Sequence, residues 1–136
     1  MILVDSNVAI DSFNRDAVHN DWSAEMLTRS RKERVFINAV IVAELAVRAI
    51  SREHLEKMLD MLSVPIDPMD TAVAFRAGQA FADWIDNGGR RGAMIPDFLI
   101  GAHASVRGAR VLTRDPRRFR AYFPEVGLIV PDQDND

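Results

Sequence analysis

Short runs of large and β-branched apolar residues recur along this chain and alternate with longer stretches of helical periodicity. The predicted strands are residues 2–5, 35–38, a short segment at Ile66, 111–113 and 128–130. The predicted helices begin near Ser6 and span about 19–33, 39–50, 52–62, 70–86 and 96–106. Strands separated by helices pair in parallel, so this order predicts an α/β fold with a central, mostly parallel sheet of about five short strands and helices on both faces.

The length and composition indicate one globular domain. The chain has 136 residues, of which 48% are apolar and 27% charged, as in ordinary folded domains. We expect the domain to span 1–131, followed by a short acidic tail at 132–136. No apolar run approaches the roughly 20 residues that cross a bilayer, and nothing near Met1 is typical of an export signal. Because cysteine is absent, thiolate metal sites are excluded and a cytoplasmic location is expected.

Acidic residues occur where a parallel α/β sheet places its ligand site, beyond the carboxyl ends of the strands. Asp5 ends the first predicted strand, and Asp115 follows the strand at 111–113. Asp97 comes directly after Pro96, a residue that suits the first turn of a helix. Each acid also has a structural interpretation: Asp5 as a cap, Asp97 as a charge on the helix dipole, and Asp115 as the start of an Asp-Pro turn.

Glu44 is harder to explain structurally, because it lies within the apolar segment AVIVAELAVRAI at 39–50. We expect this segment to form a buried helix, where an unpaired carboxylate is costly. Arg48, four residues further on, could pair with Glu44 if that face of the helix were exposed. We favour the alternative, in which Glu44 belongs to a functional site.

A cluster of these four acids would need a divalent cation, protons or arginines, because two carboxylates about 5 Å apart repel by roughly 3 kcal/mol at an effective dielectric of about 20. Oxygen ligands without cysteine or a paired-histidine motif favour Mg²⁺, or Mn²⁺, over zinc. We expect Asp5, Asp97 and Asp115 to bind the metal directly. The sequence leaves open whether Glu44 binds it directly or through water, and whether one or two ions are held.

Arginine is concentrated in the later part of the chain, although the formal net charge is −3. Between Gly88 and Arg120, eight arginines are accompanied by only two carboxylates. This segment could contact the phosphate backbone of a nucleic acid, or it could be a solvated surface. The predicted RNA-binding residues are Arg90, Arg91, Arg114, Arg117 and Arg118.

These motifs resemble those of PIN domains, and specifically those of VapC-type toxins from toxin–antitoxin pairs. LVDSNVAID resembles the first strand and first acid of the family, VAEL its helical glutamate, IPDFLIGAHA its third acid and VLTRDPRRF its fourth; FPEVGLIVP resembles its closing segment. The resemblance covers residues 2–131. It implies a Mg²⁺-dependent endoribonuclease in which the four acids are catalytic.

The resemblance also implies supporting residues and partners. Ser6 and Thr113 match positions where hydroxyl groups often support the acids, whereas Arg117 and Arg118 stand where some relatives have a further acid. His103 is not assigned as a base. A homodimer is implied, as is a small VapB-like antitoxin that silences the enzyme. An arginine of that antitoxin could pair with the acids, and apolar residues of the early helices could form its groove.

Three other classes of protein are alternatives. A response-regulator receiver would need a lysine near its end, but the last lysine here is Lys57. A phosphatase of the haloacid dehalogenase type would open with Asp-x-Asp, whereas Asn7 occupies that third position. A catalytically inert PIN-like module that binds RNA or protein is the serious alternative, although such a module is expected to have lost one of the acids.

Overall fold

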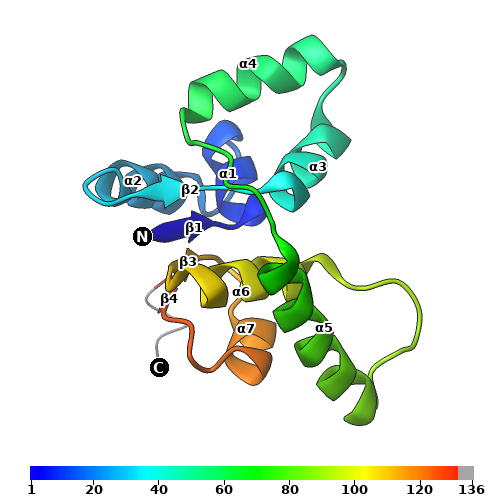
Figure 1. Cartoon of the computed structure of the whole chain (residues 1–136). Coiled ribbons are helices and arrows are strands. Elements are labelled where there is room, and N and C mark those ends of the chain that lie inside the picture. The colour runs from blue at the N-terminus through cyan, green and yellow to red at the C-terminus, as the bar shows by residue number, and fades with distance from the viewer. Residues whose placement is uncertain (132–136) are drawn as a thin grey trace.

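The computed structural model describes residues 1–131. Across this range, four parallel strands lie between two layers of helices (Figure 1). The strands are β1 (Ile2–Val4), β2 (Val35–Phe36), β3 (Arg110–Leu112) and β4 (Leu128–Ile129), in the order β2-β1-β3-β4. The predicted α/β fold class is therefore confirmed. The expected acidic tail at 132–136 lies outside the described residues.

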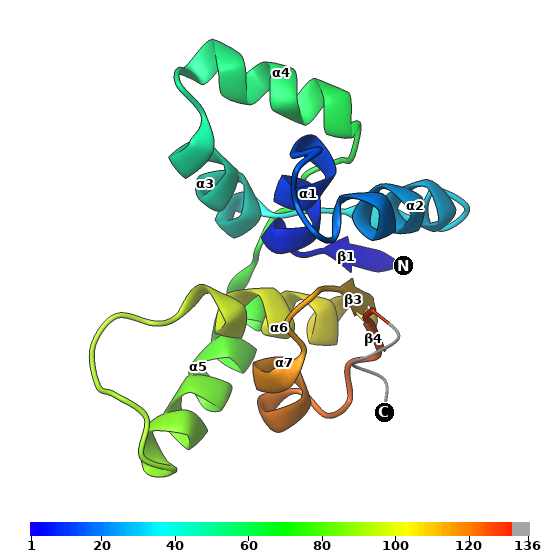
Figure 2. The ribbon, with the colours of Figure 1, turned by 180° about the vertical axis from the view of Figure 1, so that it is seen from behind.

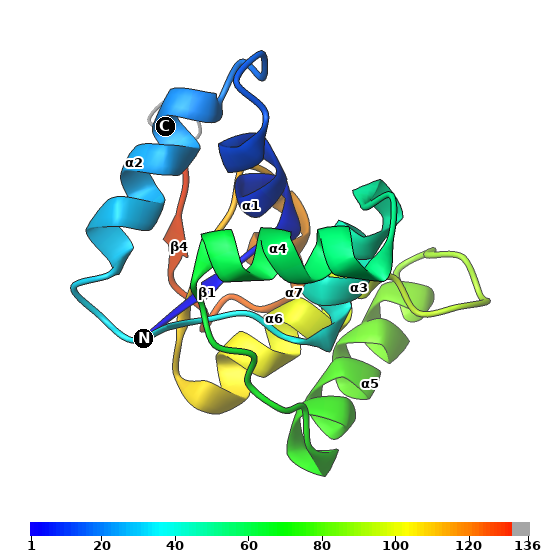
Figure 3. The same ribbon diagram turned by 90° about the horizontal axis from the view of Figure 1, so that it is seen from above.

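The helices are α1 (Ser6–Phe13), α2 (Asn20–Ser30), α3 (Ala39–Arg48), α4 (Arg52–Leu62), α5 (Thr71–Asp86), α6 (Pro96–Arg107) and α7 (Arg117–Tyr122). Figure 2 shows α1, α3 and α4 on one side of the sheet and α5, α6 and α7 on the other. Seen from above in Figure 3, α4 extends across the domain over β1. No helix within residues 1–131 combines the length and the apolar character needed to span a bilayer.

The two central strands, β1 and β3, form the most deeply buried part of the sheet. Leu3 and Val4 of β1 have no exposed surface, and neither have Val111 and Leu112 of β3. Leu3 pairs with Val111, and Val4 pairs with Leu112. Because helices cover both faces of this sheet, neither face of these strands can be polar. This burial explains why the apolar runs in the sequence are continuous instead of alternating.

A fifth strand does not form at Ile66. This residue makes an isolated parallel bridge with Ile37. The Ile37 amide donates to the Pro65 carbonyl at 2.9 Å, and the Asp67 amide donates to the Ile37 carbonyl at 2.8 Å. Pro65 and Pro68 cannot donate to a ladder, so the pairing stays at one residue.

The apolar segment at 39–50 is less buried than its composition predicts. Within α3, only Ile41 and Leu45 are buried. Val47 is 85% exposed, and Ile50, beyond the end of the helix, is 90% exposed. One face of α3 packs against α1 and α6, and Ala46 and Val47 in its last turn are exposed. The expectation of a buried helix was therefore wrong for all but the face that carries Ile41 and Leu45.

A chain of buried hydrogen bonds joins the start of α3 to α6. Asn38 Oδ1 accepts from the Ile41 amide at 3.1 Å, and Asn38 Nδ2 lies 3.0 Å from His103 Nδ1. His103 Nε2 lies 2.7 Å from Asp67 Oδ2, which also accepts from Arg107 Nε at 2.9 Å. Since the Asn38 amide nitrogen can only donate, neutral His103 carries its proton on Nε2. His103 is fully buried and holds the two helices together.

Candidate functional site

Asp5 lies at the carboxyl end of β1, next to the end of β3. Its amide donates to the Leu112 carbonyl at 2.9 Å, which continues the pairing of the two strands. Asp5 Oδ1 accepts from the Ser6 amide at 2.8 Å, so the side chain caps α1. Asp5 Oδ2 accepts from the Thr113 hydroxyl at 2.8 Å and from Asn7 Nδ2 at 3.3 Å. Asp5 is thus a helix cap, and it is also the most deeply buried of the four acids.

The surroundings of Asp5 make its negative charge costly. Burial raises the pKa of Asp5 to about 6, and the negative charges of Asp97 and Glu44 act in the same direction. The hydrogen bonds from Thr113 and Ser6 oppose this rise. Because both neighbouring acids act on Asp5, the three carboxylates share one electrostatic environment.

Glu44 projects from the middle of α3 and is partly buried. Its Oε1 atom is buried and has no hydrogen-bond partner. Burial and the charge of Asp97 raise the pKa of Glu44, while the Ser6 hydroxyl beside it partly offsets the effect. The ion pairs of residues 1–131 include none between Glu44 and Arg48. The structural alternative for Glu44 therefore has no support.

Asp97 lies in the first turn of α6, directly after Pro96. Its Oδ2 atom accepts from Arg118 Nη1 at 3.0 Å. Burial raises the pKa of Asp97, and Asp115 adds to the rise, whereas Arg118 lowers it. Asp97 is therefore the acid that couples electrostatically to each of the other three.

Asp115 follows β3 and is the most exposed of the four acids, with a side chain 59% exposed. Its amide donates to the Thr113 hydroxyl at 3.0 Å. Its side chain lies 3.5 Å from Arg117 Nε. A hollow of about 350 Å³ is lined by Asp97, Asp115, Arg117, Arg118 and Tyr122. The site therefore opens to solvent on the side of Asp115.

Two polar residues of α1 contact residues predicted for the site and were not themselves identified from the sequence. Asn7 Nδ2 donates to both Asp5 Oδ2 and Thr113 Oγ1, each at 3.3 Å, and Asn7 Oδ1 accepts from the Arg114 amide at 3.1 Å. Asp11 is buried and forms an ion pair with the Arg114 side chain. The position of Asn7 two residues after Asp5, on the first turn of a helix, was the available signal.

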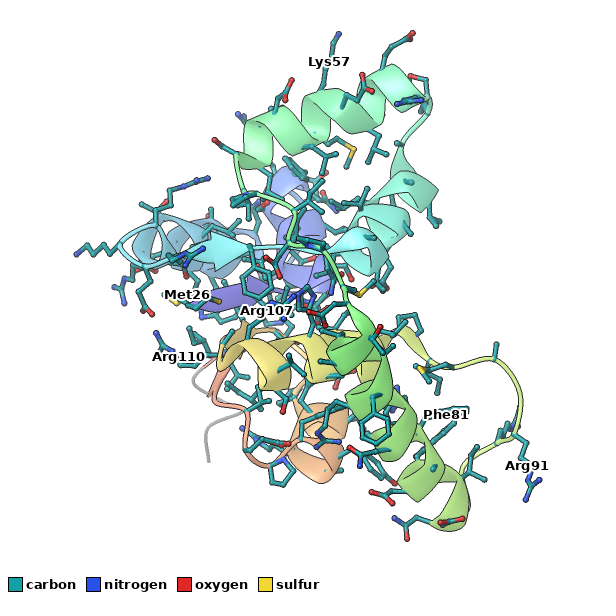
Figure 4. All side chains as sticks on the ribbon, in the orientation of Figure 1. Met26, Lys57, Phe81, Arg91, Arg107 and Arg110 are labelled. Carbon is teal, nitrogen blue, oxygen red and sulfur yellow. The ribbon has the colours of Figure 1, made fainter. Side chains whose placement is uncertain are left out.

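The predicted RNA-binding arginines divide into two groups. Arg114 and Arg118 form ion pairs with Asp11 and Asp97, respectively. The other three are exposed: Arg117 has a side chain 90% exposed, and Arg90 and Arg91 lie in the loop between α5 and α6. Figure 4 shows Arg91 at the outer bend of that loop, pointing away from the domain. These three arginines are accessible to a large polyanion.

The chemistry of the acids suits a hard divalent cation, although their geometry in residues 1–131 is not closed around one. No three His, Cys, Asp or Glu side chains in this range are arranged to hold a metal ion together. However, the unpartnered Glu44 oxygen and the burial of Asp5 are what a cation would relieve. All the donors are oxygens, the ligands that Mg²⁺ and Mn²⁺ prefer. For three of the carboxylates to bind one ion directly, their side chains would have to move closer together.

Known proteins resemble this chain in sequence and in fold. The profile of the PIN domain family matches residues 2–123. A chain of VapBC2 from Rickettsia felis, bound to a DNA fragment from their promoter, has a TM-score of 0.73 and 22% identity over 97% of this chain and 100% of that one. FitAcB from Neisseria gonorrhoeae has a TM-score of 0.72 and 25% identity over 95% of this chain and 96% of that one. DNA-bound VapBC from Salmonella typhimurium has a TM-score of 0.71 and 23% identity over 95% of this chain and 96% of that one. No curated protein matches significantly.

The described residues thus define an α/β domain with an acidic site at the carboxyl ends of its central strands. The family profile covers most of the chain, and the chain belongs to the PIN domain family.

Proposed function

We propose that this chain is a Mg²⁺-dependent endoribonuclease and acts as the toxin of a type II toxin–antitoxin pair. The observation that carries the proposal is the buried Glu44 oxygen without a partner, in a PIN domain where burial and the charge of Asp97 raise the pKa of both Asp5 and Glu44. Buried acids with perturbed pKa values at the edge of a hollow are typical of catalytic sites.

In this proposal Asp5, Asp97 and Asp115 hold the metal. A cation bound there would supply positive charge to stabilise the phosphate during hydrolysis. Glu44 Oε1 is the buried carboxylate oxygen within residues 1–131 that receives no hydrogen bond, so it is free to accept a proton from the attacking water. A raised pKa suits a carboxylate to this role near neutral pH.

The exposed arginines guide the RNA in this proposal. Arg117 lines the hollow beside Asp97 and Asp115, and Arg90 and Arg91 extend the positive surface from the neighbouring loop. Contacts between arginine and phosphate weaken steeply as salt increases. We expect RNA affinity to fall between low and physiological salt, and the combined Arg90→Gln and Arg91→Gln variant to show a shallower salt dependence. An RNA affinity independent of salt would contradict this role.

The direct test is Asp5→Asn in an assay of RNA cleavage with and without Mg²⁺. We expect the variant to lose at least about 100-fold in rate, as losses of catalytic groups commonly do. Asp60→Asn makes the same chemical change on the exposed face of α4 and is the matched control. Cleavage by Asp5→Asn at the original rate, with the fold checked by circular dichroism, would remove the nuclease assignment.

A catalytically inert binding module is the second candidate. The observation in its favour is that no three acids within residues 1–131 are arranged around a metal position. The same assay separates the two candidates. An inert module binds RNA or protein without Mg²⁺-dependent cleavage, and its Asp5→Asn variant behaves as the parent does.

Two partners are also proposed. The similar structures from Rickettsia felis and Salmonella typhimurium are VapBC complexes, which supports a small VapB-like antitoxin as partner. Trp22 lines a hollow of about 460 Å³ with residues of α2 and β4, so apolar antitoxin side chains could reach it. An antitoxin arginine could bind two acids in fork geometry and exclude Mg²⁺.

We also propose a homodimer; Phe75 on α5 is 67% exposed. Light scattering that finds only monomer over a broad concentration range would exclude it.

A further inference from the structure

Arg118 brings a positive charge from α7 into the acidic site. Its Nη1 atom donates to Asp97 Oδ2 at 3.0 Å, although the two residues lie on different helices. The exposed fractions of the two side chains are 34% and 30%. Both partners are therefore mostly shielded from water, unlike Arg117 and Asp115, whose side chains are 90% and 59% exposed.

The Arg118 guanidinium has a second set of contacts close to the first. Its central carbon lies 5.7 Å from the ring centroid of Trp84 on α5 and 5.9 Å from that of Phe98 on α6. A cation within about 6 Å of a ring centroid is attracted to the ring face. These contacts do not involve Asp97, so the guanidinium keeps favourable neighbours if the carboxylate is taken by another cation.

Asp97, the acid that pairs with Arg118, is coupled electrostatically to the other three acids. The charge of Asp97 raises the pKa of both Asp5 and Glu44, and Asp115 raises that of Asp97. A divalent cation placed among the four acids would therefore contact Asp97. While Arg118 holds Oδ2, a cation at that oxygen would face both a donor hydrogen and a like charge.

We propose that Arg118 competes with the divalent cation for Asp97. In the metal-free protein Arg118 closes the ion pair, and on metal binding it moves towards Trp84 and Phe98. This inference rests on the metal-dependent function proposed above and adds the residue that sets the affinity for the metal. It explains how the partly buried Asp97 carboxylate is tolerated when no metal is bound.

The affinity test is calorimetric titration of Mn²⁺ into the wild-type protein, Arg118→Gln and the control Arg52→Gln. Arg118→Gln should bind Mn²⁺ about three- to tenfold more tightly, because the competing ion pair is partly shielded from solvent. Arg52→Gln removes the same charge from an exposed ion pair with Glu56 on α4 and should change the affinity less than twofold. Arg118→Lys keeps the charge without the fork geometry, and its Mn²⁺ affinity should lie between those of the wild type and Arg118→Gln. Circular dichroism checks that each variant is folded.

A spectroscopic test follows the movement itself. In a Trp22→Phe background, Trp84 is the remaining tryptophan, and we expect its fluorescence to change on addition of Mg²⁺. The change should disappear in Arg118→Gln. Equal or weaker Mn²⁺ affinity in Arg118→Gln would overturn the inference while leaving the proposed function intact. If neither the wild type nor any variant binds Mn²⁺ or Mg²⁺, the metal-dependent function fails and this inference fails with it.

Discussion

The protonation of Asp5 links the acidic site to the stability of the fold. Its pKa is raised from 3.8 to about 6, mainly by burial. The folded state therefore binds a proton more tightly than the unfolded state does. The stabilising contribution of protonated Asp5 is complete below about pH 4 and is lost as the pH rises through about 6. A rise of this size corresponds to about 3 kcal/mol.

We accordingly predict that the free energy of unfolding of Asp5→Asn, relative to wild type, increases by up to about 3 kcal/mol between pH 4 and pH 7. Asparagine carries no charge, so it is spared the cost of ionisation at neutral pH. Urea titrations in the presence of a chelator measure the difference. The contributions of Asp67 and Asp70, whose lowered pKa values change stability in the opposite direction, are common to both proteins and cancel in the difference. A difference independent of pH would contradict the prediction.

Glu44 should show the same conflict between charge and burial. Glu44→Gln keeps the size of the side chain and removes the charge from the unpartnered oxygen. In metal-free protein at pH 7 we expect a gain in unfolding free energy of up to about 1 kcal/mol, measured by urea denaturation. Glu53→Gln, on the exposed first turn of α4, should change it much less. A loss of stability in Glu44→Gln would mean that the charge has a partner.

Single residues also show where inference from sequence ends. Asp5 and Asp97 could be placed because a strand end and a helix start are local features of the sequence. The ion pair of Asp97 with Arg118 depends on how α7 packs beside α6, which no local pattern specifies. Asp11 and Arg114 are 103 positions apart, and their pairing likewise follows from the tertiary fold. The arginine excess was visible, but not which arginines were already paired.

Helix α6 illustrates how one position can control the packing of an element. A Cβ atom built on Gly101 would overlap the ring of Phe123, so the helix approaches that ring more closely than alanine allows. Phe123 is fully buried and cannot move outward without opening the core. The glycine is therefore required by packing, in a helix that also carries Asp97.

Gly101→Ala is predicted to lower the free energy of unfolding by about 1–3 kcal/mol, the usual cost of overpacking a core. Gly78→Ala is the matched control, because it lies in α5 with nothing within 4 Å of an added Cβ. Without a clash, alanine favours the helix, and Gly78→Ala should gain about 0.5–1 kcal/mol. Thermal and urea unfolding of both variants provide the measurement. Equal effects in the two would show that Gly101 is not constrained by Phe123.

The elements were easier to predict than their limits. Continuous apolar runs indicated β1 and β3 because both strands are covered on both faces. The prolines around Ile66 and the position of Ile37 limit the pairing there to one residue. The exposure of Val47 could not be read from α3 alone, because burial depends on the neighbours that the fold places against each face.

For the whole molecule, the proposed function makes a prediction about growth. Expression of the chain alone should slow bacterial growth, whereas Asp97→Asn should be harmless, because its cleavage activity is lost. Asp83→Asn, an exposed acid on α5, should remain as toxic as wild type. Growth curves at matched expression levels give the comparison, and co-expression of a cognate antitoxin should restore growth. If folded wild type and Asp97→Asn are equally harmless, the inert binding module becomes the better account.

The order of strands in the sheet has a consequence for protein synthesis. Strand β3 lies beside β1 at the centre of the sheet, yet it is among the last elements that the ribosome makes. Thr113 and Asp5, whose hydrogen bond joins the ends of these strands, are 108 residues apart. A nascent chain that has displayed only its first hundred residues lacks both β3 and Asp115. The chain therefore remains without a complete acidic site until translation of the domain is nearly finished.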